Sequence, residues 1–163
     1  IRLWGPWRLV PGFGLQVMTM EFKSAMEWAL VGAGVGQLVL CLASPAIPVV
    51  LGWREKVACL PKLERQIFWT YACYVLGAHL VFAVLSIAGA PLLLGGDGLA
   101  MAWTGFIGCW WGARLVLHWT TFDTGEVPVG PWAKLAEHGL GFLFLVLTVT
   151  YVTALVLNLK GGL

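Results

Sequence analysis

The chain has 163 residues, of which 60% are hydrophobic and only 11% are charged. Soluble domains carry about 25% charged residues, so this composition excludes a single water-soluble core. The formal net charge of +2 comes from scattered basic residues and gives no reason to expect nucleic-acid binding. The composition is typical of an integral membrane protein.

The first 24 residues combine tryptophan and arginine with a high density of proline and glycine. Proline and glycine at this density oppose a regular helix. Tryptophan and arginine suit the headgroup layer of a bilayer, where an amphipathic ring or a long cationic side chain meets both phases. We therefore predict an interfacial arm over residues 1–24, followed by a membrane domain over residues 25–163.

After the arm, the apolar residues fall into four blocks, each close to the roughly 20 residues that a helix needs to cross a bilayer. The predicted spans are 25–51, 66–88, 99–120 and 135–159. Because the connections between them are short, the sequence predicts an all-α membrane protein whose four transmembrane helices form an up-down bundle.

The first span contains Gly32 and Gly36, which lie about one turn apart on the same helix face. Small residues at this spacing let a second helix approach closely, so we predict that the pair packs against a neighbouring helix. Pro45 and Pro48 stand near the end of this span. They predict a kink or an early end of the helix there.

The second span carries His79 about 20 Å along the helix, too deep for its side chain to reach the headgroups easily. Two interpretations remain open for this residue. It is either a neutral histidine hydrogen-bonded between helices, or a cofactor ligand or proton relay.

In the third span, Trp110, Trp111, Arg114 and His118 share one helix face. Arg114 lies about 9 Å from the helix end, so its side chain can extend to the headgroups while stacking on a tryptophan. The alternative is an internal salt bridge, for example with Asp123, or a contact with an anionic ligand. The predicted partner or anion contact comprises Arg114, Trp110, Trp111, Arg65 and Asp123.

The positions of the three histidines limit how a haem could bind. His118 ends the third span and His138 begins the fourth, so these two lie at one level, whereas His79 is about 15 Å deeper. Only His118 and His138 could therefore ligate one haem together, although a lone histidine could still hold a porphyrin-type pigment. All three are candidate cofactor-binding residues for haem or chlorophyll, with a quinone as a further candidate near Arg114.

We find no catalytic constellation in the sequence: no closely spaced carboxylates within a span, no nucleophile elbow and no phosphate-binding loop. The four cysteines form no Cys-x-x-Cys pair, so neither a dithiol redox site nor a metal site is predicted. The sequence therefore favours a protein that is not an enzyme and holds no metal or other cofactor.

Two segments resemble an uncharacterised family of small four-helix bacterial integral membrane proteins. They are "LERQIFWTYACYVLGAHL", beginning at Leu63, and "GFIGCWWGARLVLHWTTFD", which ends at Asp123. The resemblance rests on the start of the second span, the Trp-Gly-Ala-Arg-Leu end of the third, and the acidic residue that follows. It implies a bacterial cytoplasmic membrane and four helices, and it implies no activity.

Lysine and arginine favour cytoplasmic loops. The first and third loops together hold Arg54, Lys56, Lys62, Arg65 and Lys134, and the other side holds Arg2, Arg8, Lys23 and Lys160. We therefore expect both termini outside.

Two functional hypotheses follow. The first is a non-catalytic accessory or assembly subunit that binds other membrane subunits and phospholipids. The second is an electron-transfer or pigment-binding subunit that uses its histidines.

Overall fold

The structure, a computed structural model, describes residues 13–121 and 130–161. Every regular element in these two ranges is a helix. The helices are α1 (Phe13–Ala43), α2 (Ala46–Val50), α3 (Trp53–Ala58), α4 (Lys62–Ala88), α5 (Ala90–Leu93), α6 (Gly98–Thr120) and α7 (Pro131–Leu159). The prediction of an all-α chain is therefore confirmed for the part of the chain that the structure describes.

Three stretches of helix are long and apolar enough to cross a membrane: Met20–Val50, Lys62–Ala88 and Lys134–Leu159. They correspond to the first, second and fourth predicted spans. The third predicted span forms α6, which is not among the three. Arg114 and His118 both lie in the second half of this helix.

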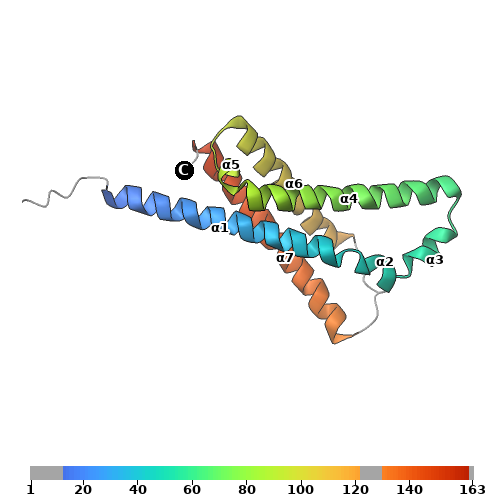
Figure 1. The fold of residues 1–163 in the computed structure, drawn as a ribbon. Coiled ribbons are helices and arrows are strands. Elements are labelled where there is room, and N and C mark those ends of the chain that lie inside the picture. Colours follow the sequence, from blue (N-terminus) through green and yellow to red (C-terminus); the bar gives the residue numbers. More distant parts are fainter. Residues whose placement is uncertain (1–12, 122–129, 162–163) are drawn as a thin grey trace, which may run out of the picture.

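The long helices form two antiparallel pairs. Helix α1 lies along α4, α6 lies along α7, and the second pair crosses the first (Figure 1). Helix α1 contacts α7 where the pairs cross, and the short α5 packs against α6 and α1. The buried core therefore lies at the crossing, where side chains from all four long helices meet.

Helix α1 begins inside the predicted arm, at Phe13. Pro6 and Pro11 precede that position, whereas Leu15–Ser24 contains no proline or glycine and can continue the helix. Residues 13–24 of the predicted arm are thus the first turns of α1. The rest of the predicted arm, residues 1–12, lies outside the described residues.

The far end of α1 breaks at its prolines, as predicted. The helix ends at Ala43, and the backbone N–H of Ser44 makes a last bond of 2.9 Å to the carbonyl of Leu40. Pro45 has no N–H to continue the series, so α2 starts as a separate helix. Gly52, with φ +62°, then turns the chain into α3.

Helices α1 and α4 approach each other closely at Gly34. A Cβ placed on Gly34 would lie 2.9 Å from the carbonyl oxygen of Ala83 and 2.7 Å from Cγ1 of Ile87. Of the predicted packing pair, Gly36 faces Leu143 of α7, at 3.1 Å from an added Cβ, while Gly32 has nothing within 4 Å. Gly32 is about 200° around the helix from Gly34, so it faces away from α4.

A row of glycines also lines the contact between α6 and α7. These are Gly105, Gly108 and Gly112. A Cβ on Gly108 would meet Cβ of Tyr151 at 3.5 Å, and one on Gly112 would meet the methyl of Thr148 at 3.6 Å. The lack of side chains on this face lets α6 lie against α7 along several turns.

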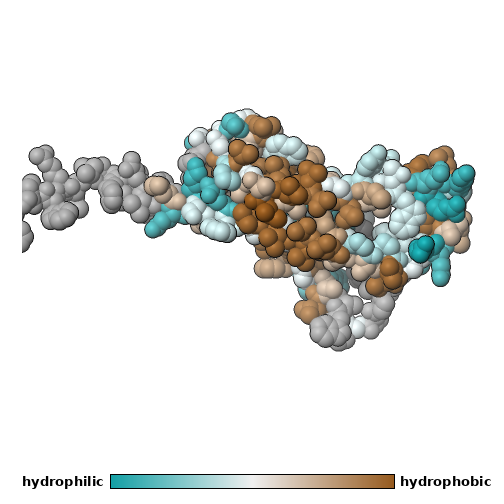
Figure 2. All heavy atoms as spheres, in the orientation of Figure 1, coloured by the Kyte–Doolittle hydropathy of each residue, from teal (hydrophilic) through white to brown (hydrophobic). Residues whose placement is uncertain are grey.

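Figure 2 shows how polarity is distributed over one face of the molecule. Hydrophobic atoms gather over the middle of the pair formed by α1 and α4, and hydrophilic atoms lie toward both ends of that pair. An apolar middle with polar ends is the pattern expected of helices that cross a bilayer.

Candidate functional site

His79 makes a hydrogen bond between two helices. Nε1 of Trp110 on α6 donates to Nε2 of His79 on α4 at 3.0 Å. The imidazole is buried and stacks on Trp111, with ring centroids 4.8 Å apart and planes 26° apart. Because Nε2 accepts this bond, the ring is the neutral tautomer with its proton on Nδ1. The bond occupies the Nε2 lone pair, the nitrogen through which a haem iron or a chlorophyll magnesium could be ligated.

Arg114 is half-buried and lies over an aromatic ring of α7. Its Cζ is 5.7 Å from the ring centroid of Phe144, within the range of a cation–π contact. Trp111 stacks on the same phenylalanine, with centroids 5.5 Å apart. The sequence pattern predicts a tryptophan under the arginine and carries no signal for Phe144, because only the register between α6 and α7 brings this ring to Arg114.

Of the other two predicted members of the partner or anion contact, the structure describes Arg65. Nη1 of Arg65 donates to the carbonyl oxygen of Ala58 at 3.4 Å, where α3 leads into α4. This position is about 21 Å along α4 from His79. Asp123 lies outside the described residues.

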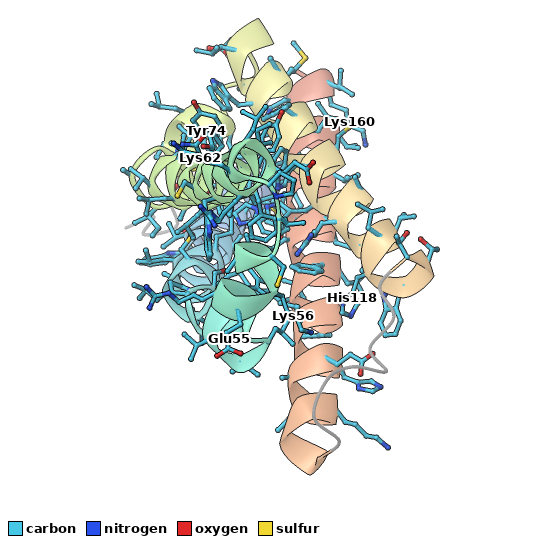
Figure 3. All side chains as sticks on the ribbon, turned by 90° about the vertical axis from the view of Figure 1, so that its right-hand side faces the viewer. Glu55, Lys56, Lys62, Tyr74, His118 and Lys160 are labelled. Atoms are coloured by element: carbon cyan, nitrogen blue, oxygen red, sulfur yellow. The ribbon has the colours of Figure 1, made fainter. Side chains whose placement is uncertain are left out.

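His118 and His138 lie at the same end of the pair formed by α6 and α7. The ring centroid of Trp119 is 5.0 Å from that of His118 and 6.4 Å from that of His138. The edge of His118 packs onto α7 at Gly141, where an added Cβ would lie 3.2 Å from Nε2 (Figure 3). Both imidazoles contact one indole, so a tetrapyrrole ligated by both would have to displace it.

His138 is exposed, and its Nδ1 lies 2.8 Å from the carbonyl oxygen of Lys134, one turn earlier in α7. When Nδ1 donates to this oxygen, Nε2 is left with its lone pair. Of the other two histidines, His79 has its Nε2 occupied by Trp110, and Nε2 of His118 is buried without a hydrogen-bond partner among the described residues. His138 is thus the histidine with an exposed side chain.

A chain of three buried polar side chains joins α1, α4 and α7. Nε2 of Gln37 donates to the hydroxyl of Tyr151 at 2.7 Å, and the hydroxyls of Tyr151 and Ser86 are hydrogen-bonded to each other. The hydroxyl of Ser86 in turn donates to the carbonyl of Phe82 at 2.7 Å. The bonds therefore run in one direction, from glutamine through tyrosine to serine, and each oxygen accepts from the group before it.

Asn158 makes a second polar connection at the opposite end of α7 from His138. Its Nδ2 donates to the carbonyl of Leu93 at 2.8 Å, and its Oδ1 accepts from the backbone N–H of Gly96 at 3.0 Å. Nδ2 also lies 3.4 Å from the hydroxyl of Thr104 on α6. This asparagine satisfies backbone groups of the turn between α4 and α6 that helices cannot satisfy themselves.

The sequence contains a weak signal for these connections. Gln37, Ser86 and Asn158 are polar residues inside strongly apolar blocks, where such groups usually face the protein interior. Which residue meets which depends on how the two helix pairs cross, and no periodicity in one helix can specify that.

The outer face of α4 presents a shallow groove of about 280 Å³. Its lining comes from Gln66, Ile67, Thr70, Tyr71 and Tyr74. Tyr71 and Tyr74 are 65% and 70% exposed, and Tyr74 lies on the side of α4 away from α7 (Figure 3). We call this surface the α4 groove.

The interior groups do not form a metal centre in the described ranges, where no group of three or more histidine, cysteine or acidic side chains could hold an ion. Comparisons of the chain with protein-family models, with curated proteins and with solved structures give no match. Chemically, the arrangement offers interhelical hydrogen bonds, a cation on an aromatic ring, and outward-facing tyrosine hydroxyls.

Proposed function

We propose that this chain is a non-catalytic accessory or assembly subunit of a bacterial integral membrane protein complex, which binds partner subunits and phospholipids. The α4 groove is the observation on which this proposal rests. It presents polar side chains outward from a helix that is long and apolar enough to cross a membrane.

The position of these polar groups along α4 favours a protein partner. Tyr71 and Tyr74 lie about 14 and 18 Å from the start of the helix, past the headgroup layer. Acyl chains offer a tyrosine hydroxyl no hydrogen bond, so a hydroxyl that faces lipid at this depth is unfavourable. A neighbouring transmembrane helix can supply an acceptor, and polar side chains often join helices in this way.

The interior contacts support a structural role. His79, Tyr151 and Asn158 each bond to a different helix or turn, and together they link all four long helices. Such bonds fix the relative positions of helices, as a subunit that presents a defined surface to a partner requires.

The proposed arrangement in the membrane includes α6 as a fourth span. At 23 residues, α6 is about 35 Å long, enough to cross a hydrocarbon core of about 30 Å. The four long helices would then run alternately up and down, with α3 on the cytoplasmic side and both termini outside, in a bacterial cytoplasmic membrane. The basic residues of α3 and of the start of α4 favour this orientation.

Photo-crosslinking tests the proposal directly. A photoreactive phenylalanine analogue at Tyr74 should give one discrete adduct with an identifiable membrane protein in the native membrane. The same analogue at Phe142, which is 67% exposed on α7, is the matched control and should give lipid adducts. The double variant Tyr71→Leu/Tyr74→Leu should lose the co-purifying partner, whereas Phe142→Leu should keep it. Lipid adducts alone at both positions would contradict a partner at the α4 groove.

A second candidate function, an electron-transfer or pigment-binding subunit, is favoured by one observation. Aromatic rings of α4, α6 and α7 follow one another at centroid distances of 4.8 to 6.4 Å. The series contains Trp103, Phe106, Trp110, His79, Trp111, Phe144, His118, Trp119 and His138. An absorption spectrum of the protein purified in mild detergent separates the two candidates, because bound haem or chlorophyll gives an intense visible band.

A further inference from the structure

Helix α3 and the start of α4 meet at one end of the pair formed by α1 and α4 (Figure 1). The indole of Trp53 on α3 packs edge-to-face with Phe68 on α4, with ring centroids 5.2 Å apart. Nη1 of Arg65 on α4 donates to the carbonyl oxygen of Ala58, the last residue of α3, at 3.4 Å. These two contacts hold α3 beside the first turns of α4. We call residues 53–65 the α3–α4 corner.

The α3–α4 corner carries four basic side chains and two acidic ones. The basic residues are Arg54 and Lys56 on α3 with Lys62 and Arg65 on α4, and the acidic residues are Glu55 and Glu64. Figure 3 views the molecule from this end and labels Lys56 and Lys62. Arg54 and Lys62 are both exposed, and within the described ranges neither forms a salt bridge with an acidic side chain. The corner therefore presents positive charge that an external anion can neutralise.

Two exposed leucines lie among these charges. Leu60 is 38% exposed and Leu63 is 67% exposed. Leucine side chains gain free energy when they leave water, whereas cationic side chains need water or an anion around them. A partner that suits both must combine negative charge with an apolar interior. An anionic phospholipid does so, because its phosphate lies next to its acyl chains, whereas a soluble acidic segment would match the basic residues alone.

The α3–α4 corner lies at the level where phospholipid headgroups are expected. The apolar stretch of α4 that is long enough to cross a membrane begins at Lys62. Figure 2 shows hydrophilic atoms at this end of the pair, beside the hydrophobic middle. Arginine binds phosphate oxygens through two parallel N–H groups, and lysine binds them as a point charge. Arg54 on α3 and Lys62 on α4 thus offer phosphate-binding groups from two helices at one membrane surface.

We propose that the α3–α4 corner binds anionic phospholipids, with the headgroup phosphate in contact with Arg54 and Lys62. Negatively charged lipid surfaces attract basic residues, and each lysine or arginine near such a surface strengthens binding about fivefold. This inference deepens the phospholipid-binding part of the proposed function and rests on it. The binding of lipid and of a protein partner can fail separately, because other residues line the α4 groove and the crosslink at Tyr74 reports on that groove.

Native mass spectrometry of the full-length protein in detergent tests the proposal. The protein is titrated with dioleoylphosphatidylglycerol, which is anionic, or with dioleoylphosphatidylcholine, which has no net charge, and the Kd of the first bound lipid is measured. The parent should bind phosphatidylglycerol severalfold more tightly than phosphatidylcholine. Arg54→Gln and Lys62→Gln should each weaken the binding of phosphatidylglycerol about fivefold. Lys160→Gln removes one positive charge at an exposed position at the end of α7, and this matched control should bind both lipids as the parent does.

A soluble headgroup distinguishes a lipid site from a site for free phosphate. Glycerol phosphate in large molar excess should not displace phosphatidylglycerol, because it brings no acyl chains to Leu60 and Leu63. Three outcomes would overturn the proposal. They are equal affinities of the parent for the two lipids, displacement of the lipid by glycerol phosphate, and affinities of Arg54→Gln and Lys62→Gln that do not differ from that of Lys160→Gln.

Discussion

Tyr151 should contribute more to stability through its hydroxyl than any exposed tyrosine of this chain. Tyr151→Phe removes one oxygen and leaves the ring in place, so the packing of α7 is kept. Two interhelical hydrogen bonds disappear, one from Gln37 on α1 and one with Ser86 on α4. Hydrogen bonds between transmembrane helices contribute on average about 0.6 kcal/mol and at most about 1.7 kcal/mol. The free energy of unfolding should therefore fall by about 1–3 kcal/mol.

The measurement is reversible unfolding in mixed micelles of increasing sodium dodecyl sulfate content, followed by tryptophan fluorescence. Tyr74→Phe is the matched control, because this hydroxyl faces outward and its loss should change the unfolding free energy by less than about 0.5 kcal/mol. Ser86→Ala combined with Tyr151→Phe completes a double-mutant cycle and isolates the bond between the two hydroxyls. If Tyr151→Phe unfolds within about 0.5 kcal/mol of the parent, the polar chain does not hold the helices together.

Three further predictions concern the packing of α1, the N-cap of α6 and the hydrogen bond of His79. Gly34→Ala should destabilise the protein by about 1–3 kcal/mol, because its Cβ would meet the Ala83 carbonyl oxygen at 2.9 Å, whereas Gly32→Ala should be neutral or stabilising; the same unfolding assay compares them. Asp97→Ala removes the side chain that accepts from the N–H of Ala100 at 2.7 Å at the start of α6, and should cost about 0.5–2 kcal/mol in thermal or detergent unfolding. Trp110→Phe should shift the ¹⁵N resonance of His79 Nε2 toward that of an imidazole nitrogen without a donor; an unchanged resonance would mean that Nε2 is not an acceptor in the membrane.

The helices of this chain could be predicted because each has a local cause. Apolar blocks of membrane-spanning length gave the positions of α4 and α7 to within a few residues. Pro45 stops α1 by removing a backbone donor, wherever the helix goes in space. Helix α1 starts earlier than predicted, because the prolines and glycines of segment 1–24 end at Gly14 and the residues after it can be helical.

The contacts between helices could be predicted only in part. The spacing of Gly32 and Gly36 indicates one helix face that can pack closely. Gly34 lies on the opposite face and is equally small. A single helix does not show which of its faces meets a neighbour. In the structure, α4 packs against the face that holds Gly34, and α7 packs against Gly36. Gly34 is thus in a tight contact, whereas Gly32, two residues earlier, has open space beside it.

The same limit applies to the interior polar residues: the sequence indicates each of them singly and does not indicate which of them bond to each other. His79 was identified as a buried polar group from its depth alone, and Trp110 from its place on the face of Arg114. Their hydrogen bond depends on α4 and α6 meeting where the two helix pairs cross. Gln37 and Tyr151 are 114 residues apart in the chain, and Ser86 and Tyr151 are 65 apart. Polar residues in apolar blocks thus indicate which positions face the interior, and the crossing of the helix pairs determines which of them bond.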